Sequence, residues 1–139
     1  MTDLENAIKN LDGHSIALCK DDVLITDDGR GISPMMKFIS QGRELSGFSC
    51  ADAVVGKAAA ELFVKAGIIE VYGKIMSRPA DKFLTEKNIP HSFSQLADNI
   101  LNVKKSGLCP MESAVKDIDD PDEAYSALKA KVAEMKKAH

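Results

Sequence analysis

Tryptophan is missing from this chain of 139 residues, and aromatic residues make up only 5% of it. A cationic excess is missing too, because the formal net charge at pH 7 is -3. A protein that grips nucleic acid needs a positively charged footprint, and one that binds single strands usually adds aromatic side chains for stacking. We therefore expect no nucleic-acid partner.

Long apolar runs are also absent. Runs such as 58–60 and 68–69 are far shorter than the roughly 20 residues that a membrane-spanning helix needs. Residues 1–5 lack the basic and apolar regions of a signal peptide, so we expect a cytoplasmic protein with no membrane partner. With 45% hydrophobic and 28% charged residues, the composition is that of one soluble globular domain over residues 1–139.

The three cysteines are widely spaced and form no CxxC pair. An odd number without a secretion signal favours reduced thiols over a disulfide framework. Cys19 and Cys50 lie in apolar runs, which predicts small, buried core residues. Cys109 has a different setting, and we expect its thiol to react faster than the other two.

Hydrophobic periodicity divides the chain into alternating elements. Helices are predicted at 2–11, 33–42, 58–66, 77–88, 109–118 and from 120 onward, and strands at 15–19, 23–26, 50–55, 68–76 and 89–96. Ser33 is the predicted N-cap of the second helix, and residues 100–103 fit neither pattern. The first two strands form a hairpin, and the alternation after it requires a mainly parallel sheet with crossover helices. The predicted fold class is therefore α/β, a three-layer α/β/α sandwich around a mixed five-stranded sheet.

Two turns, at 54–58 and 75–79, run directly from a strand into a helix. Ligands bind at this carboxyl edge of parallel α/β sheets, where helix N-termini present free N–H groups and a positive dipole end. The predicted ligand-binding residues are Gly56, Lys57, Ser77 and Arg78. They would hold a phosphate or carboxylate in one cleft. The alternative is a tight turn at Gly56 with two solvated cations, and Gly-Lys alone lacks the spacing of a P-loop.

The order of elements, together with these turns, resembles the cytidine deaminase-like fold. Zinc-binding members carry H-x-E or C-x-E at the first turn and P-C-x-x-C at the second. Here Pro79 is kept, but Ala80 and Phe83 stand where the two cysteine ligands belong, and Lys57 lies in the first motif. Because these side chains do not bind zinc, the resemblance implies a scaffold with no metal, no cofactor and no deaminase activity. It also implies that the anionic ligand is a nucleotide or a molecule derived from one.

Four further segments, at 28–31, 56–60, 107–113 and 117–125, span most of the chain. In this order and spacing they resemble an uncharacterised prokaryotic family, a domain of unknown function that is assigned a deaminase-like fold. That family has no established activity, so the resemblance implies a fold and not a reaction.

The segment Cys109-Pro110-Met111-Glu112 is the most distinctive motif. Pro110 at the first helical position makes Cys109 the N-cap, where the helix dipole favours the thiolate. Glu112 opposes this charge, and its carboxylate is placed to reach back to a free N–H of its own helix, as in a capping box. The segment is a plain helix start, a ligand contact, or a catalytic pair in which Cys109 acts as nucleophile or sulfur carrier.

The remaining polar residues give weaker signals. His14, His91 and His139 form no cluster, although one of them close to Cys109 in space would serve as its base. The acidic run 117–123 lacks the spacing of a calcium-binding EF-hand and fits a helix end followed by a capped helix start. The leading hypothesis is a metal-free binding protein for an anionic or nucleotide-like small molecule. The alternatives are an enzyme that uses Cys109 and a non-catalytic interaction module that forms a homodimer.

Overall fold

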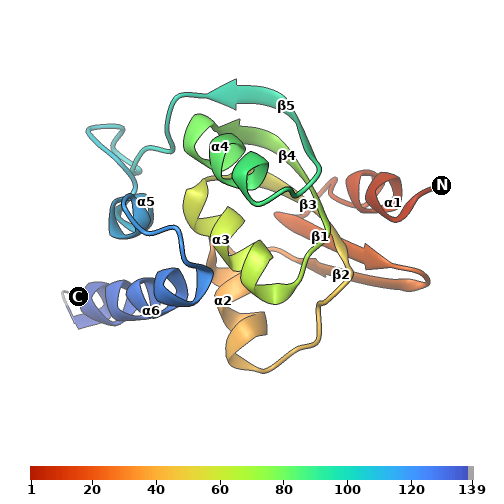
Figure 1. Cartoon of the computed structure of the whole chain (residues 1–139), viewed down its shortest axis with the longest axis horizontal. Coiled ribbons are helices and arrows are strands. Elements are labelled where there is room, and N and C mark those ends of the chain that lie inside the picture. The colour runs from red at the N-terminus through yellow and green to blue at the C-terminus, as the bar shows by residue number, and fades with distance from the viewer. Residues whose placement is uncertain (138–139) are drawn as a thin grey trace.

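A computed structural model describes residues 1–137, and His139 lies outside the described residues. The strands are β1 (Ile16–Lys20), β2 (Val23–Asp27), β3 (Ser49–Val55), β4 (Glu70–Ser77) and β5 (His91–Ala97). They form one sheet in the order β2-β1-β3-β4-β5 (Figure 1). β1 pairs antiparallel with β2 and β3, whereas β3, β4 and β5 run parallel. The mixed five-stranded sheet and its hairpin are as predicted.

Helices cover both faces of this sheet. They are α1 (Asp3–Lys9), α2 (Ser33–Ser40), α3 (Lys57–Ala66), α4 (Arg78–Glu86), α5 (Pro110–Val115) and α6 (Pro121–Lys137). α1 packs on one face, where Ala7 and Leu11 contact Ala17 and Ala51. The other helices lie on the opposite side, with α2, α5 and α6 packed around α3 (Figure 1). This arrangement confirms the three-layer α/β/α sandwich.

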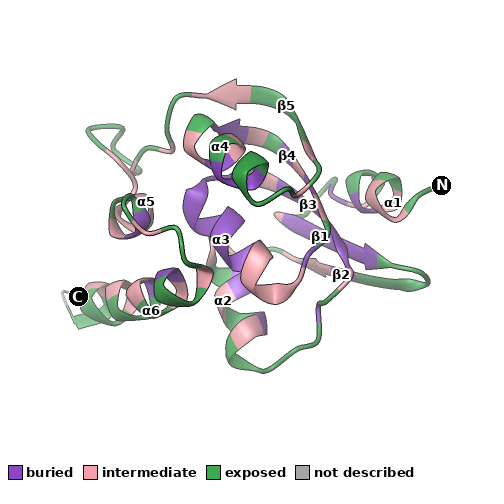
Figure 2. Cartoon of the chain, viewed as in Figure 1, coloured by how far each residue is buried: buried purple, intermediate pink, exposed green. Residues whose placement is uncertain are grey.

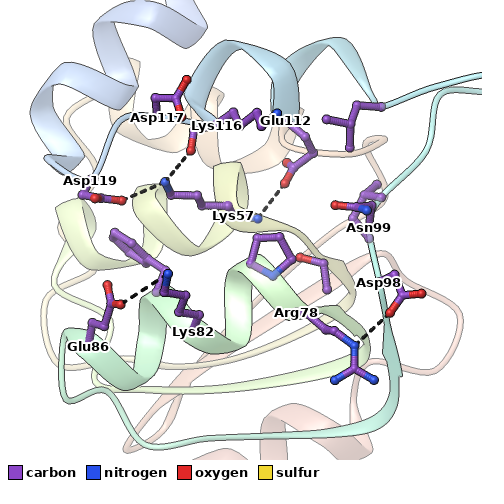
Figure 3. Close-up of a pocket in the computed structure, with 15 residues that line it drawn as sticks. Lys57, Arg78, Lys82, Glu86, Asp98, Asn99, Glu112, Lys116, Asp117 and Asp119 are labelled. Carbon is purple, nitrogen blue, oxygen red and sulfur yellow. Dashed lines mark hydrogen bonds and ion pairs between the residues drawn. The ribbon is translucent and has the colours of Figure 1, made fainter.

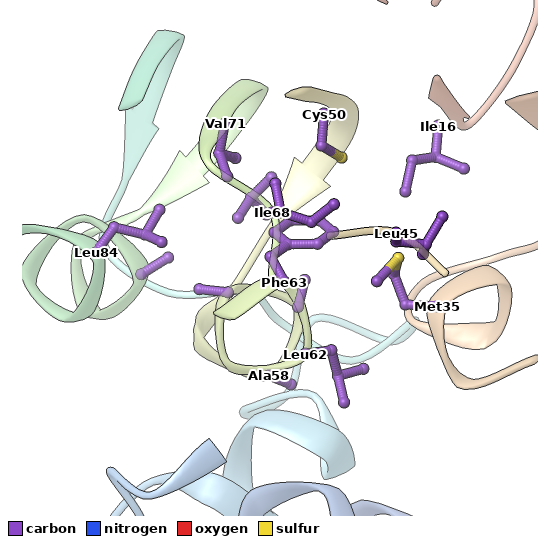
Figure 4. Packing of buried hydrophobic residues seen from close by; sticks show 14 of the residues in the cluster. Ile16, Met35, Leu45, Cys50, Ala58, Leu62, Phe63, Ile68, Val71 and Leu84 are labelled. Carbon is purple, nitrogen blue, oxygen red and sulfur yellow. The ribbon is translucent and has the colours of Figure 1, made fainter. Parts of the chain in front are cut away.

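α3 is the centre of the main core. Its buried residues include Ala58, Leu62 and Phe63, and Figure 4 shows Phe63 and Ile68 packed beneath the strands. Figure 2 shows that burial is nearly continuous along the first turns of α3, whereas α5 and α6 remain largely half-buried or exposed. The helix ends at Gly67, which adopts the left-handed conformation with φ of 83° that favours glycine. The stop signal predicted at this glycine is confirmed.

Several boundaries differ from those predicted. Ile32, not Ser33, is the N-cap of α2, so that prediction is wrong by one residue. α5 ends at Val115 and not near residue 118, because the chain then turns toward α6. The ambiguous residues 100–103 form no strand, and one isolated bridge joins Leu101 to Leu108.

The cysteines lie as expected. Cys19 and Cys50 are buried, whereas Cys109 is half-buried. Burial raises the pKa of the Cys50 thiol, and the nearby Asp52 raises it further. Within residues 1–137, no helix is long and apolar enough to cross a membrane.

Candidate functional site

A pocket of about 700 Å³ opens at the carboxyl edge of the sheet (Figure 3). The first residue of α3 lines it, as do the residues that follow β5, the last residue of β4 and the start of α4. The opposite wall is formed by α5 and its connection to α6. The apolar lining residues are Pro79, Phe83, Ile100 and Leu108. The charged lining residues are Lys57, Arg78, Lys82, Lys116, Glu86, Asp98, Glu112, Asp117 and Asp119. A pocket of this volume that combines apolar and polar lining residues suits a small molecule.

Lys57 and Arg78 both line this pocket, which confirms that they face one cleft. The Lys57 ammonium is not solvated as the alternative required. It lies 2.8 Å from Asp119 Oδ1 and donates to the carbonyl of Lys116 at 3.1 Å. The same ammonium holds the pKa of the Asp119 carboxyl below its usual range. Lys57 therefore fastens the connection between α5 and α6 to the start of α3.

The backbone of Lys57 binds a second acidic residue. Its N–H donates to Glu112 Oε1 at 2.7 Å, and the N–H of Ala58 donates to Glu112 Oε2 at 3.2 Å. The Glu112 carboxylate thus occupies the first turn of α3, where the sequence predicted an external anion. A Cβ atom on Gly56 would lie 2.5 Å from Glu112 Oε1, so only glycine leaves room for this carboxylate.

This geometry corrects the prediction that Glu112 caps its own helix. α5 has no side-chain cap, because the Glu112 carboxylate is directed at two amides of α3. Those amides supply two donors and the positive end of a longer helix. A carboxylate that capped its own short helix, α5, would gain less from the helix dipole. Burial raises the pKa of Glu112, while the hydrogen bonds from Ala58 and Lys57 partly offset that rise.

The start of α4 is arranged differently from the start of α3. The Ser77 hydroxyl accepts a hydrogen bond from the N–H of Ala80 at 3.2 Å, so α4 is capped by its own N-cap residue. Arg78 extends outward with its side chain 65% exposed, and its Nε donates to Asp98 at 2.8 Å (Figure 3). Of the four residues predicted to bind a ligand, Arg78 is the one whose charged side chain is open to solvent.

Sequence reasoning missed Glu61, which lies one helical turn beyond Lys57 on α3. Its side chain is fully buried, and neither carboxyl oxygen has a hydrogen-bond partner among residues 1–137. Burial raises the pKa of Glu61 to about 8, and the charge of Lys57 counteracts part of that rise. The one available signal was a single glutamate inside an otherwise apolar helical stretch.

Cys109 is the N-cap of α5, as its position before Pro110 predicted. Across residues 1–137, no hydrogen bond joins its thiol to Glu112, His14 or His91. His91 instead contacts Asp81 at 2.6 Å, and His14 contacts Asp28 at 2.6 Å. Among the described residues, the structure therefore shows Glu112, His14 and His91 each bonded to a partner other than Cys109.

Two of the residues that stand where the deaminase-like resemblance would place zinc ligands are core residues. Ala80 and Phe83 are buried in the main core. In the part of the chain that the structure describes, no group of three or more His, Cys, Asp or Glu side chains is arranged to hold a metal ion.

Comparison with known proteins places the chain in a family. A family model described as TM1506, a domain of unknown function (DUF1893), matches residues 5–132. A solved structure of a DUF1893 family protein (TM1506) from Thermotoga maritima is 25% identical, with a TM-score of 0.84 over 92% of this chain and 88% of that chain. A search of curated proteins gave no match. The expected resemblance to a domain of unknown function is confirmed, and the chain belongs to the TM1506 (DUF1893) family.

Proposed function

We propose that this protein binds a small molecule carrying a carboxylate or phosphate group in the pocket at the carboxyl edge of its sheet. The observation that carries the proposal is the contact of Glu112 with the N–H groups of Lys57 and Ala58. The first turn of α3 already holds an acidic group there, through the donors and dipole that suit phosphates and carboxylates.

Two cations on α4 supply charge that a ligand can recruit. The Arg78 and Lys82 side chains are 65% and 79% exposed, and both line the pocket. Their partners, Asp98 and Glu86, are themselves exposed. Exposed ion pairs contribute only about 0–1 kcal/mol, so a multiply charged ligand can replace them at little cost.

The apolar part of the pocket suits a ring. Pro79, Phe83, Ile100 and Leu108 contribute carbon surface between the charged walls. A molecule with a flat base or ring and an acidic group would use both parts, as a nucleotide or its derivative does. This ligand class also agrees with the deaminase-like resemblance, which is an argument from fold analogy.

Binding is favoured over catalysis because, within residues 1–137, no hydrogen bond joins the Cys109 thiol to Glu112, His14 or His91. The experiment is a thermal-shift screen followed by calorimetry, with inorganic phosphate, pyrophosphate, nucleoside monophosphates and the corresponding uncharged nucleosides. A ligand at 100 times its dissociation constant would stabilise the protein by roughly 2.7 kcal/mol. We expect the phosphorylated compounds to raise the unfolding midpoint and the nucleosides to do so less.

The matched variants are Arg78→Gln and Arg30→Gln, since Arg30 is an exposed arginine that does not line the pocket. We expect Arg78→Gln to weaken binding at least fivefold and Arg30→Gln to leave it unchanged. Equal losses of affinity in the two variants would overturn the proposal. It would also be overturned if no phosphorylated compound bound to the wild type or to a Glu112 variant.

A further inference from the structure

We infer that Glu112 is a displaceable occupant of the α3 amides, so that the acidic group of a ligand must replace its carboxylate to bind there. This inference rests on the proposed function and concerns how the same site is regulated. Its basis is that one set of donors, the N–H groups of Lys57 and Ala58, serves the internal carboxylate and would serve the ligand.

The two helix starts at the pocket show why this contact differs from an ordinary cap. α4 is closed by its own Ser77, the residue type that usually caps a helix. α3 has Gly56 at the same position, with no side chain to offer. The space beside Gly56 is filled instead by a carboxylate from a segment more than fifty positions away. The α3 amides therefore take their acceptor from another segment of the chain and not from the helix's own N-cap residue.

The segment that carries Glu112 is short and mostly half-buried or exposed. In α5, Val115 is the one fully buried residue, while Met111 and Ala114 pack half-buried against the main core. The connection between β5 and α5 contains no helix or strand. The cost of moving a segment is low when it buries few apolar contacts. Lys57 still holds the far end of the segment through the Lys116 carbonyl and Asp119, so α5 can shift without detaching.

An internal carboxylate competes as if it were a ligand at a fixed concentration. The apparent affinity of an external ligand is its intrinsic affinity multiplied by the fraction of molecules in which the amides are free. Removing the competing carboxylate should therefore strengthen binding, and loss of the contact, not loss of the charge, should be responsible.

The test measures inorganic pyrophosphate binding by calorimetry in the wild type, Glu112→Ala, Glu112→Asp and Glu123→Gln. Asp is shorter by one methylene and keeps the charge while losing reach, whereas Glu123 is exposed on α6 and serves as the matched control. We expect at least a fivefold gain in affinity for both Glu112 variants and none for Glu123→Gln. Circular dichroism and thermal unfolding establish that each variant is folded.

A second readout follows the segment itself. Hydrogen exchange of residues 111–116 in the wild type should increase when pyrophosphate binds, because the ligand releases Glu112. Binding with equal affinity in the wild type and both Glu112 variants overturns this inference and leaves the proposed function standing. A gain in Glu112→Ala without one in Glu112→Asp also overturns it, since charge alone would explain that result. Absence of binding in all four proteins overturns the proposed function as well.

Discussion

Lys57 and Glu112 are 55 positions apart in the sequence, yet the N–H of one donates to the carboxylate of the other at 2.7 Å. The contact joins α5 to the start of α3 at the edge where ligands bind in α/β proteins. The Lys57 side chain joins the following connection to the same point. One residue thus fixes the wall of the candidate pocket through both its backbone and its side chain.

The space beside Gly56 gives the first prediction. Gly56→Ala places a Cβ atom 2.5 Å from Glu112 Oε1, so the carboxylate must move away. We expect a loss of about 1–3 kcal/mol in the free energy of unfolding, the usual cost of overpacking. Chemical denaturation measures it, with Gly107→Ala as the control because nothing lies within 4 Å of that site. In a Glu112→Ala background the added methyl should cost much less, and an unchanged cost there would contradict the account.

The buried Glu61 carboxyl gives the second prediction. Its pKa rises from 4.5 to about 8, so the folded state binds the proton more tightly than the unfolded state. The stability that the protonated Glu61 carboxyl contributes is fully present below about pH 4.5 and is lost as the pH rises through about 8. Because the Glu61→Gln side chain cannot ionise, the free energy of unfolding of this variant should exceed that of the wild type by roughly 3–5 kcal/mol at pH 9. The difference at pH 5 should be far smaller.

Denaturation curves at pH 5, 7 and 9 measure this difference. Glu123→Gln, an exposed substitution on α6, should show no such trend. A Glu61→Gln variant with the same pH dependence as the wild type would show that Glu61 does not titrate in this way.

Asp52 on β3 gives the third prediction, with a lower pH window. Burial raises the pKa of this carboxyl from 3.8 to about 7, while hydrogen bonds from the backbone of Val54 and Ala53 offset part of the rise. The stability that protonated Asp52 contributes is lost as the pH rises from about 4 through 7. Asp52→Asn retains an oxygen for the Val54 N–H and should be more stable than the wild type at pH 8. We expect the variant and the wild type to have equal free energies of unfolding at pH 4 and the variant to be the more stable at pH 8. A variant that is less stable at both pH values would refute this prediction.

The fourth prediction concerns the three thiols. Cys109 is half-buried at a helix start, whereas Cys19 and Cys50 are buried, and burial raises the pKa of Cys50. We expect Cys109 to be alkylated at least tenfold faster than the other two in the folded protein. Peptide mass spectrometry after timed alkylation measures each site. Because Glu112 is directed at α3, Glu112→Gln should change the rate at Cys109 little, and equal rates at all three cysteines would contradict the prediction.

Local patterns were sufficient to predict most of the fold. The polar turn between two short apolar runs predicted the hairpin, and the strand followed at once by Gly56 predicted the start of α3 at the sheet edge. Pro110 likewise placed Cys109 at an N-cap, which the structure confirms. These signals depend on residues close together in the chain, so a single sequence contains them.

The contacts inside the candidate site depend on distant residues and were not predictable. Nothing near Glu112 indicates that its acceptor atoms meet the amides of α3 and not those of α5. Glu61 is buried because the elements after residue 109 cover the outer side of α3, a packing that periodicity does not specify. The pocket was placed correctly from the two turns, but its internal acidic occupant required the tertiary structure.

The most direct measurement is a titration of the 15N-labelled protein with inorganic pyrophosphate, followed through the amide signals of Lys57 and Ala58. The account predicts saturable shifts of these two signals, accompanied by changes at residues 111–116 as Glu112 leaves the amides. Signals of Lys57 and Ala58 that stay in place at saturating pyrophosphate, in both the wild type and Glu112→Gln, would contradict it.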